Sequence, residues 1–135
     1  MTDCLFCNIA AGTSPAFKIR EDENFLAFFD IFPNTQGQTL VIPKKHYDSD
    51  LFLVEEKGFY EKYLQAAREV VNLLKKGLGV ARVAVVAEGL AVPHLHLRLY
   101  PLYPGIPLSV EAGEKADFEA LGALQTQVVN GAALK

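Results

Sequence analysis

Short stretches of hydrophobic residues, each bounded by turn residues, occupy the first third of the chain. They cover residues 17–21, 25–29 and 38–43, with the polar turn 22–24 between the first two and the sequence PNTQG before the third. Apolar stretches of this length between turn residues are typical of β-strands. The pattern predicts a β-hairpin followed by a return strand.

The spacing of apolar residues changes between Glu55 and Gly77, where it becomes helical. Apolar side chains recur mostly at steps of three or four residues, at Phe59, Leu64, Ala67, Val70, Val71 and Leu74. Charged side chains fall largely between them, so this stretch predicts one long amphipathic helix. We expect the helix to end at Gly77 or Gly79, because glycine readily adopts the left-handed conformation that follows many helices.

The second half of the chain adds two strands and a weaker helix. RVAVVAE, at residues 82–88, is almost entirely apolar, and VPHLHLRLY, at residues 92–100, alternates between polar and apolar residues. Both patterns are typical of strands. Residues 117–129 favour a weaker helix after a passage rich in proline and glycine. These elements predict an α+β fold, with about five mostly antiparallel strands and one long helix against one face of the sheet.

Composition and charge indicate one soluble domain with a small-molecule partner. The chain has 135 residues, of which half are hydrophobic and 21% are charged, so we treat residues 1–135 as a single domain. A net charge of −3 gives no broad attraction for a nucleic acid polymer or an anionic membrane. No targeting or membrane-spanning segment stands out, because charged residues interrupt the longest apolar tracts. We therefore expect a cytoplasmic protein.

Two of the three histidines lie in the alternating sequence VPHLHLRLY. In a strand, His94, His96 and Arg98 would point to one side and the leucines between them to the other. The polar side chains would then be about 7 Å apart, a spacing that suits successive atoms of a phosphate ligand. Any half-exposed antiparallel strand shows the same alternation of polar and apolar residues. In that case the two histidines would only face solvent and have no function. The pattern alone leaves both interpretations open.

Three stretches taken together resemble the histidine triad (HIT) family of nucleotide-binding proteins and small hydrolases. They are CLFCNI, AFFDIFPNTQGQTLVIPKKH and VPHLHLRLYP, and the resemblance runs from about residue 4 to residue 101. Residues 105–135 have no match and stay unassigned. The resemblance implies a HIT-like fold. It also implies a nucleotide hydrolase or nucleotidyl transferase acting at the α-phosphate of a nucleoside phosphate derivative, such as a dinucleoside polyphosphate or an adenylylated small molecule.

The resemblance assigns roles to the candidate site residues. His96 would attack the α-phosphate and form a covalent nucleotidyl-histidine that water then hydrolyses. Asp30 would bond the ribose hydroxyls; the alternative is that it is only a turn residue before the sequence FPN. An apolar cleft would hold the base and sugar of a purine nucleotide, and the alternative is that its members are only core residues: Leu5, Phe6, Ile9, Phe28 and Ile31. The family needs no organic cofactor, and its members form homodimers through the long helix and a sheet edge.

A structural zinc ion is also implied. One branch of the family, with a similar N-terminal sequence, binds zinc through residues that correspond here to Cys4, Cys7, His46 and His94. Two thiolates and two imidazoles suit a closed tetrahedral zinc site. A pair of buried free thiols or a redox pair is the alternative interpretation of a single CxxC sequence, while a structural disulfide is disfavoured in a reducing cytosol.

The chain departs from the family at several positions. Arg98 occupies the third histidine position, where it can hold an anion with a forked pair of donors but cannot supply a proton to a leaving group. The loop 87–92 is short and apolar where polar phosphate contacts are usual, and Gln38 stands where many relatives have histidine. Two hypotheses follow. The chain is an enzyme that acts through His96 with Arg98 beside it, or it is a catalytically weak or inactive, zinc-stabilised nucleotide sensor.

Overall fold

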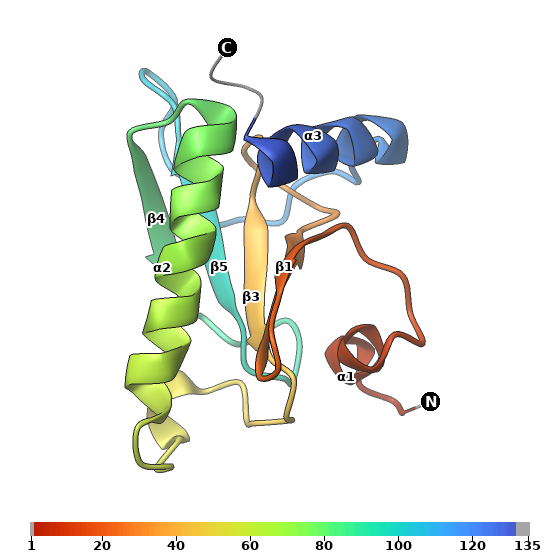
Figure 1. Ribbon diagram of the computed structural model, residues 1–135, viewed down its shortest axis with the longest axis vertical. Helices are drawn as coiled ribbons and strands as arrows, with labels where there is room; N and C mark the ends of the chain where they lie inside the picture. The colour runs from red at the N-terminus through yellow and green to blue at the C-terminus, as the bar shows by residue number, and fades with distance from the viewer. Residues whose placement is uncertain (1, 132–135) are drawn as a thin grey trace.

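The computed structural model describes residues 2–131 of the chain, and Figure 1 shows their arrangement. Five strands form one antiparallel sheet in the order β1-β2-β3-β5-β4. The prediction of an α+β fold with a five-stranded antiparallel sheet is confirmed. Residues 1 and 132–135 of the expected domain lie outside the described residues. The strands are β1 (Lys18–Glu21), β2 (Phe25–Phe29), β3 (Thr39–Pro43), β4 (Arg82–Val86) and β5 (Leu97–Leu102).

Different helices cover the two faces of this sheet. α2 (Phe59–Leu78) and α3 (Phe118–Asn130) pack on one face, and Figure 1 shows α2 running along the strands. Alternate residues of β2 and β3 point toward these helices: Phe25, Ala27, Phe29 and Val41. The short helix α1 (Leu5–Ala11) packs on the other face, against the intervening residues Leu26, Phe28, Leu40 and Ile42. The period-2 alternation of the strands thus separates two hydrophobic clusters.

α2 matches the predicted long helix, confirms its end at Gly79 and corrects one detail, the position of Leu64. The helix continues through Gly77 and ends at Leu78, with Gly79 in the left-handed conformation. Gly77 packs against α3 instead, where a Cβ atom would lie 2.7 Å from the Cα atom of Val128. Leu64, which the periodicity assigns to the apolar face, is 57% exposed, because Tyr63 and Ala66 occupy the inward positions.

The histidine strand begins later than the sequence predicts. β5 starts at Leu97, and the N–H of Leu95 donates to the Tyr47 carbonyl rather than to a neighbouring strand. The prediction that His94 and His96 lie within a strand is therefore wrong. Alternation persists through this extended segment all the same. Leu95, Leu97 and Leu99 are buried in the cluster beneath α2.

Residues 109–116, in the part of the chain without a family match, run beside the loop that follows β2. The N–H of Ala116 donates to the Ile31 carbonyl at 2.8 Å, and the N–H of Gly113 donates to the Phe32 carbonyl at 3.3 Å. The side chain of Asn34 donates to two carbonyls of the same segment. This segment therefore fixes the loop 31–34, and α3 follows it at the positions where the sequence favours a weaker helix.

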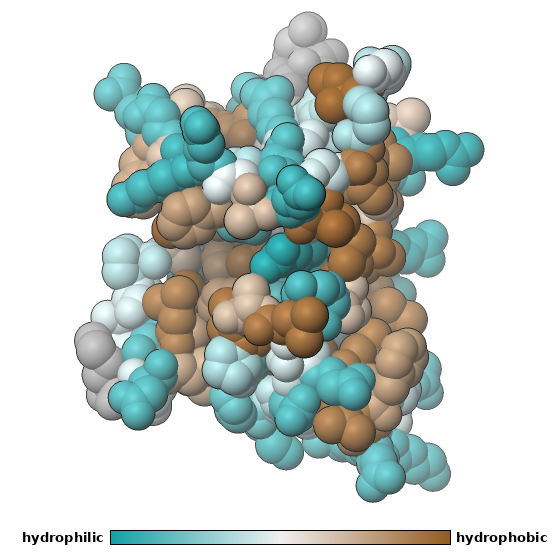
Figure 2. Space-filling view, turned by 180° about the vertical axis from the view of Figure 1, so that it is seen from behind, coloured by the Kyte–Doolittle hydropathy of each residue, from teal (hydrophilic) through white to brown (hydrophobic). Residues whose placement is uncertain are grey.

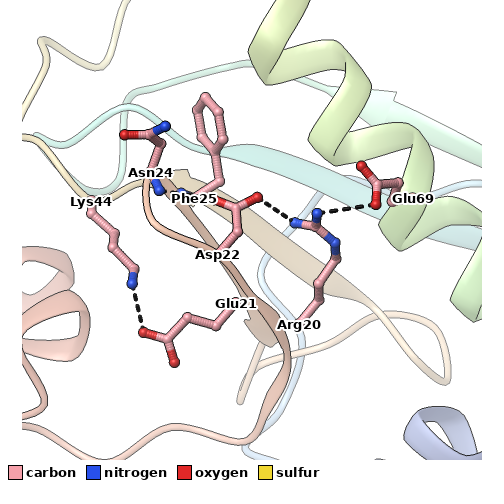
Figure 3. Close-up of polar contacts among 7 residues, drawn as sticks. All are labelled: Arg20, Glu21, Asp22, Asn24, Phe25, Lys44 and Glu69. Atoms are coloured by element: carbon pink, nitrogen blue, oxygen red, sulfur yellow. Dashed lines mark hydrogen bonds and ion pairs between the residues drawn. The ribbon is translucent and has the colours of Figure 1, made fainter.

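Charged side chains tie the β1–β2 hairpin to the rest of the fold (Figure 3). Arg20 donates to Asp22 at 2.8 Å and to Glu69 of α2 at 3.1 Å, and Glu21 pairs with Lys44 at 2.8 Å. Asp22 also accepts two backbone N–H groups within the turn. Burial acts to raise the pKa of Asp22, but these hydrogen bonds and the Arg20 charge outweigh it and lower the pKa.

No helix in the described range combines the length and the apolar character that crossing a bilayer requires.

Candidate functional site

A cavity of about 330 Å³ lies on the α1 side of the sheet. Its walls come from α1, from β2 and the loop after it, and from the segment that leads into β5. Figure 2 views the molecule from behind and shows apolar side chains gathered around a hollow on this face. All the residues that the sequence assigns to catalysis and nucleotide binding line this one cavity: Leu5, Phe6, Ile9, Phe28, Asp30, Ile31, His96 and Arg98.

His96 is almost completely buried at the wall of this cavity, with 1% of its surface exposed. The alternative interpretation, in which His96 only faces solvent, is therefore wrong. Its Nδ1 lies 2.8 Å from the His94 carbonyl, which can only accept, so Nδ1 carries the proton. Burial lowers the pKa of His96; the carbonyl hydrogen bond opposes this shift, and the Arg98 charge reinforces it. Because Nδ1 carries the proton, the neutral form of the ring, which burial favours, has its lone pair on Nε2.

Arg98 follows on β5 and lines the same cavity. Its strand neighbours are Leu40 on β3 and Val86 on β4, neither of which carries a charge. The Nε atom of Arg98 is buried and has no hydrogen-bond partner, and no carboxylate in residues 2–131 forms a salt bridge with the guanidinium. A positive charge beside His96 is thus left without a counter-ion.

Asp30 is held by hydrogen bonds on both of its carboxylate oxygens. Oδ1 accepts the N–H of Phe32 at 2.9 Å, and Oδ2 accepts the Gln38 side-chain amide at 2.8 Å. Gln38 is 2% exposed, and its own oxygen accepts the N–H of Asn34. Sequence reasoning noted Gln38 only as a departure from the family. In the structure Gln38 orients the acidic side chain at the cavity wall.

The cavity has further walls that sequence reasoning missed. Leu40 lies on β3, and neighbouring residues of a strand point to opposite faces of the sheet. Because Val41 points toward α2, this rule could have placed Leu40 on the cavity side. Ala112 belongs to the segment 109–116, for which the sequence carries no local signal. The other missed lining residues are Pro15, Ala16, Phe29 and Phe32, whereas Ala91 and Val92 belong to the loop 87–92, which the resemblance already places where phosphate contacts are usual.

The four residues predicted to bind metal form a cluster beside the cavity. The ligand atoms of Cys4, Cys7, His46 and His94 all lie within 4.8 Å of one another. His94 Nδ1 lies 3.4 Å from each sulfur and 3.2 Å from His46 Nδ1, and His46 Nδ1 lies 3.3 Å from the Cys7 sulfur. A tetrahedral zinc ion with bonds of about 2.0–2.3 Å separates its ligand atoms by about 3.3–3.8 Å. The donor set and these four separations of 3.2–3.4 Å therefore suit a four-coordinate ion of this kind.

Hydrogen bonds with backbone groups orient His94 and Cys4 within this cluster. The Pro43 carbonyl accepts from His94 Nε2 at 2.8 Å, so the Nδ1 lone pair of His94 faces the cluster. Cys4 also caps α1, because its sulfur accepts the N–H of Cys7. Burial and the adjacent Cys4 raise the pKa of Cys7 to about 11, since two neighbouring thiolates repel each other. A bound cation would remove that repulsion.

The cluster and the cavity share structural parts. The Phe6 ring packs edge-on against both His94 and His96, with ring centroids 5.8 Å and 5.3 Å apart. The His94 carbonyl is also the group that fixes the His96 tautomer. The position of the His96 ring therefore depends on His94, which is one of the four residues of the metal-binding cluster, and on Phe6, which contacts both histidines.

The chain belongs to the HIT domain family, which matches residues 11–105. An uncharacterized HIT-like protein of Borreliella burgdorferi is 34% identical over 126 residues, covering 88% of this chain and 89% of its own length. A zinc-bound histidine triad family protein of Mycobacterium smegmatis has 31% identity, a TM-score of 0.75 and 98% coverage of both chains. A HIT family hydrolase of Legionella pneumophila has 32% identity and a TM-score of 0.63, covering 82% of this chain and all of that one.

Proposed function

We propose that this chain is a nucleotide hydrolase or nucleotidyl transferase that acts at the α-phosphate of a nucleoside phosphate derivative. One observation carries the proposal: the buried His96 ring lines the cavity with its Nδ1 proton donated to the His94 carbonyl. This arrangement leaves Nε2 as the nucleophilic atom, because an imidazole with a fixed Nδ1 proton has its lone pair there.

The reaction has two displacements at phosphorus. In the first, His96 Nε2 bonds to the α-phosphorus, and the electron pair of the broken bond departs with the leaving group. In the second, water or another acceptor attacks the α-phosphorus, and the electron pair of the N–P bond returns to Nε2. The His94 carbonyl holds the imidazole ring through both steps and stabilises the positive charge that develops on it.

The cavity supports a mononucleotide as the group that is transferred. Its volume of about 330 Å³ falls within the usual range for small-molecule sites. Leu5, Phe6, Ile9 and Phe28 supply apolar surface for a purine base. Asp30 accepts hydrogen bonds from the ribose hydroxyls in this proposal, with Gln38 fixing its orientation.

The second candidate function is a nucleotide sensor with little or no turnover. Ala91 and Val92 line the cavity from the segment before the histidines, where family members supply polar phosphate contacts. Fewer polar contacts give less stabilisation of the charge that develops in the transition state, while apolar binding of the nucleoside remains.

Trapping of the covalent intermediate separates these two candidates. Wild type and His96→Ala are incubated with diadenosine tetraphosphate or adenosine 5′-phosphoramidate, labelled at the α-phosphorus, and quenched in alkali. Label on the wild type alone supports the enzyme. AMP binding without label or product in either protein supports the sensor.

We also propose that Cys4, Cys7, His46 and His94 bind a structural zinc ion. When bound, zinc holds α1 against the sheet and supplies no open position for catalysis. Metal analysis of wild type and Cys7→Ser tests this directly. About one zinc per wild-type chain and almost none in the variant is expected, and equal, near-zero contents contradict the proposal.

A homodimer remains our expectation for the assembly. β4 is an outer strand of the sheet, and Val85 on it is 56% exposed, as is much of Leu64 on α2. Both lie on elements through which family members pair. Sedimentation of wild type against Val85→Lys tests this expectation, since a charge at the interface would release monomers.

A further inference from the structure

The strongest unexplained feature of the cavity is the charge of Arg98. The guanidinium lies two residues beyond His96, lines the same cavity and has no salt-bridge partner among the described residues. Its Nε is buried without a hydrogen bond. An uncompensated charge and an unsatisfied donor at one place cost free energy unless a ligand completes them. An anion, held by the forked donors of the guanidinium, would satisfy both.

We infer that the leaving group of this chain's reaction is itself a phosphate or polyphosphate, which departs as an anion against Arg98, and not an amine. The inference rests on the proposed function and narrows its substrate class. Substrates of this class are nucleoside polyphosphates and dinucleoside polyphosphates, in which the bond that breaks joins the α-phosphorus to a bridging oxygen.

The proton requirement of the leaving group supports this choice. An amine leaves phosphorus only after its nitrogen has gained a proton, because an amide anion is too basic to depart. A phosphate leaves without one, since its last ionisation lies near neutral pH, at about 6. A guanidinium stays protonated in proteins and therefore stabilises an anion but cannot act as a general acid.

Within residues 2–131, no other side chain that lines the cavity takes over as proton donor. The titratable residues that line it are Asp30, His96 and Arg98. Both Asp30 oxygens already accept hydrogen bonds, and His96 donates through Nδ1 to the His94 carbonyl while its Nε2 is the nucleophilic atom. The charge of Glu88 acts to raise the pKa of His96, but Glu88 is exposed, accepts the N–H of Leu90 and does not line the cavity.

The reaction balances without a general acid. His96 Nε2 bonds to the α-phosphorus, the bond to the bridging oxygen breaks, and its electron pair stays on that oxygen. The departing phosphate leaves beside Arg98. Water then attacks the nucleotidyl-His96, the N–P bond breaks with its electrons on Nε2, and the proton of the attacking water passes to solvent. The products are a nucleoside monophosphate and the released phosphate or nucleotide.

The test compares two substrates that differ in the leaving group. For wild type, kcat/KM for diadenosine tetraphosphate should exceed that for adenosine 5′-phosphoramidate by about 100-fold or more, the usual contribution of a general acid. Arg98→Gln should lower polyphosphate cleavage by about 100-fold, as loss of one charge-stabilising donor does. Arg98→His restores an imidazole and should shift the ratio toward the phosphoramidate by about 10-fold or more.

Control variants keep the outcomes distinct. Arg98→Lys retains the charge and should keep the preference for polyphosphate, and Glu88→Gln should leave the ratio unchanged. Thermal unfolding of each variant identifies any that fails to fold, and the wild-type ratio decides the question by itself in that case. If wild type cleaves the phosphoramidate through His96 with the same kcat/KM as the polyphosphate, this inference is overturned and the proposed function is not. Absence of label and product from both substrates overturns the proposed function, and the inference with it.

Discussion

The two faces of the sheet are stabilised in different ways. The α2 face is a continuous apolar layer in which Tyr63, Val70 and Leu74 are at most 1% exposed. The α1 face buries His94 and His96 and partly buries two cysteines beside a cavity, beneath a helix of seven residues. The first face is stabilised mainly by the burial of apolar surface, and the second combines a smaller apolar cluster with specific polar contacts. Changes on the two faces should therefore have separable effects on stability and on activity.

The sharpest separation concerns two adjacent residues, His96 and Leu95. His96→Ala should lower nucleotide cleavage by at least about 1,000-fold, because it removes the nucleophile. Its free energy of unfolding should change by about 1 kcal/mol, since the removed ring borders an existing cavity. Steady-state kinetics and urea unfolding measure the two quantities. A variant that keeps its activity would refute the role of His96.

Leu95→Ala should show the reverse pattern. Leu95 is completely buried beneath α2, so its truncation should cost about 3 kcal/mol of unfolding free energy. Below its transition temperature the variant should still form the nucleotidyl-His96. Gln65→Ala, at an exposed position of α2, is the control and should change stability by less than about 0.5 kcal/mol. Loss of labelling in a folded Leu95→Ala protein would show that the two faces are not independent.

A smaller effect is expected at Gln38, which orients Asp30. Gln38→Ala removes the hydrogen bond to Oδ2 and should weaken AMP binding about 10-fold, the value of one charge-assisted hydrogen bond. Calorimetry with AMP and with 2′,3′-dideoxy-AMP makes the measurement specific. The variant should lose affinity for AMP and little affinity for the analogue, which lacks the ribose hydroxyls. An equal loss for both ligands would indicate general damage to the cavity.

The smallest effect concerns pH and the charged hairpin of Figure 3. The pKa of Asp22 is lower in the folded state than in the unfolded state. Asp22 therefore contributes to the free energy of unfolding above the pKa of an ordinary carboxyl group, and this contribution is lost as the pH falls through the pKa of the folded state. Asp22→Asn keeps the turn acceptor but not the charge. It should be less stable than wild type by under about 1 kcal/mol at pH 7, because the pair is partly exposed. In urea unfolding that difference should shrink below about pH 4.

Local patterns predicted the α2 face well and the α1 face poorly. The strands and α2 follow from periodicity, which each segment carries in its own sequence. α1 has only seven residues and is capped by Cys4, a residue that seldom serves as an N-cap, so no local signal marked it. The sequence pattern extended the histidine strand too far because alternation continues where the hydrogen bonds to the sheet do not.

The site residues could be brought together only by a resemblance across distant segments. Cys4 and His94 are 90 residues apart, and no spacing rule within one segment relates them. Resemblance to the family placed all the predicted lining residues correctly around one cavity. It could not indicate Ala112, which lies beyond residues 4–101 where the sequence resembles the family, or the function of Gln38, because that function depends on a contact with Asp30 that the motif does not contain.

Gly77 lies in close contact with Val128, so the residue at position 77 in a homologous sequence indicates whether α3 can pack against α2 as it does here. Even a single methyl group there would collide with the backbone of α3. A homologue with alanine or a larger residue at this position must therefore hold its C-terminal helix farther from α2, or lack that helix altogether. Inspection of one column in an alignment would thus sort family members by the architecture of their C-terminal ends.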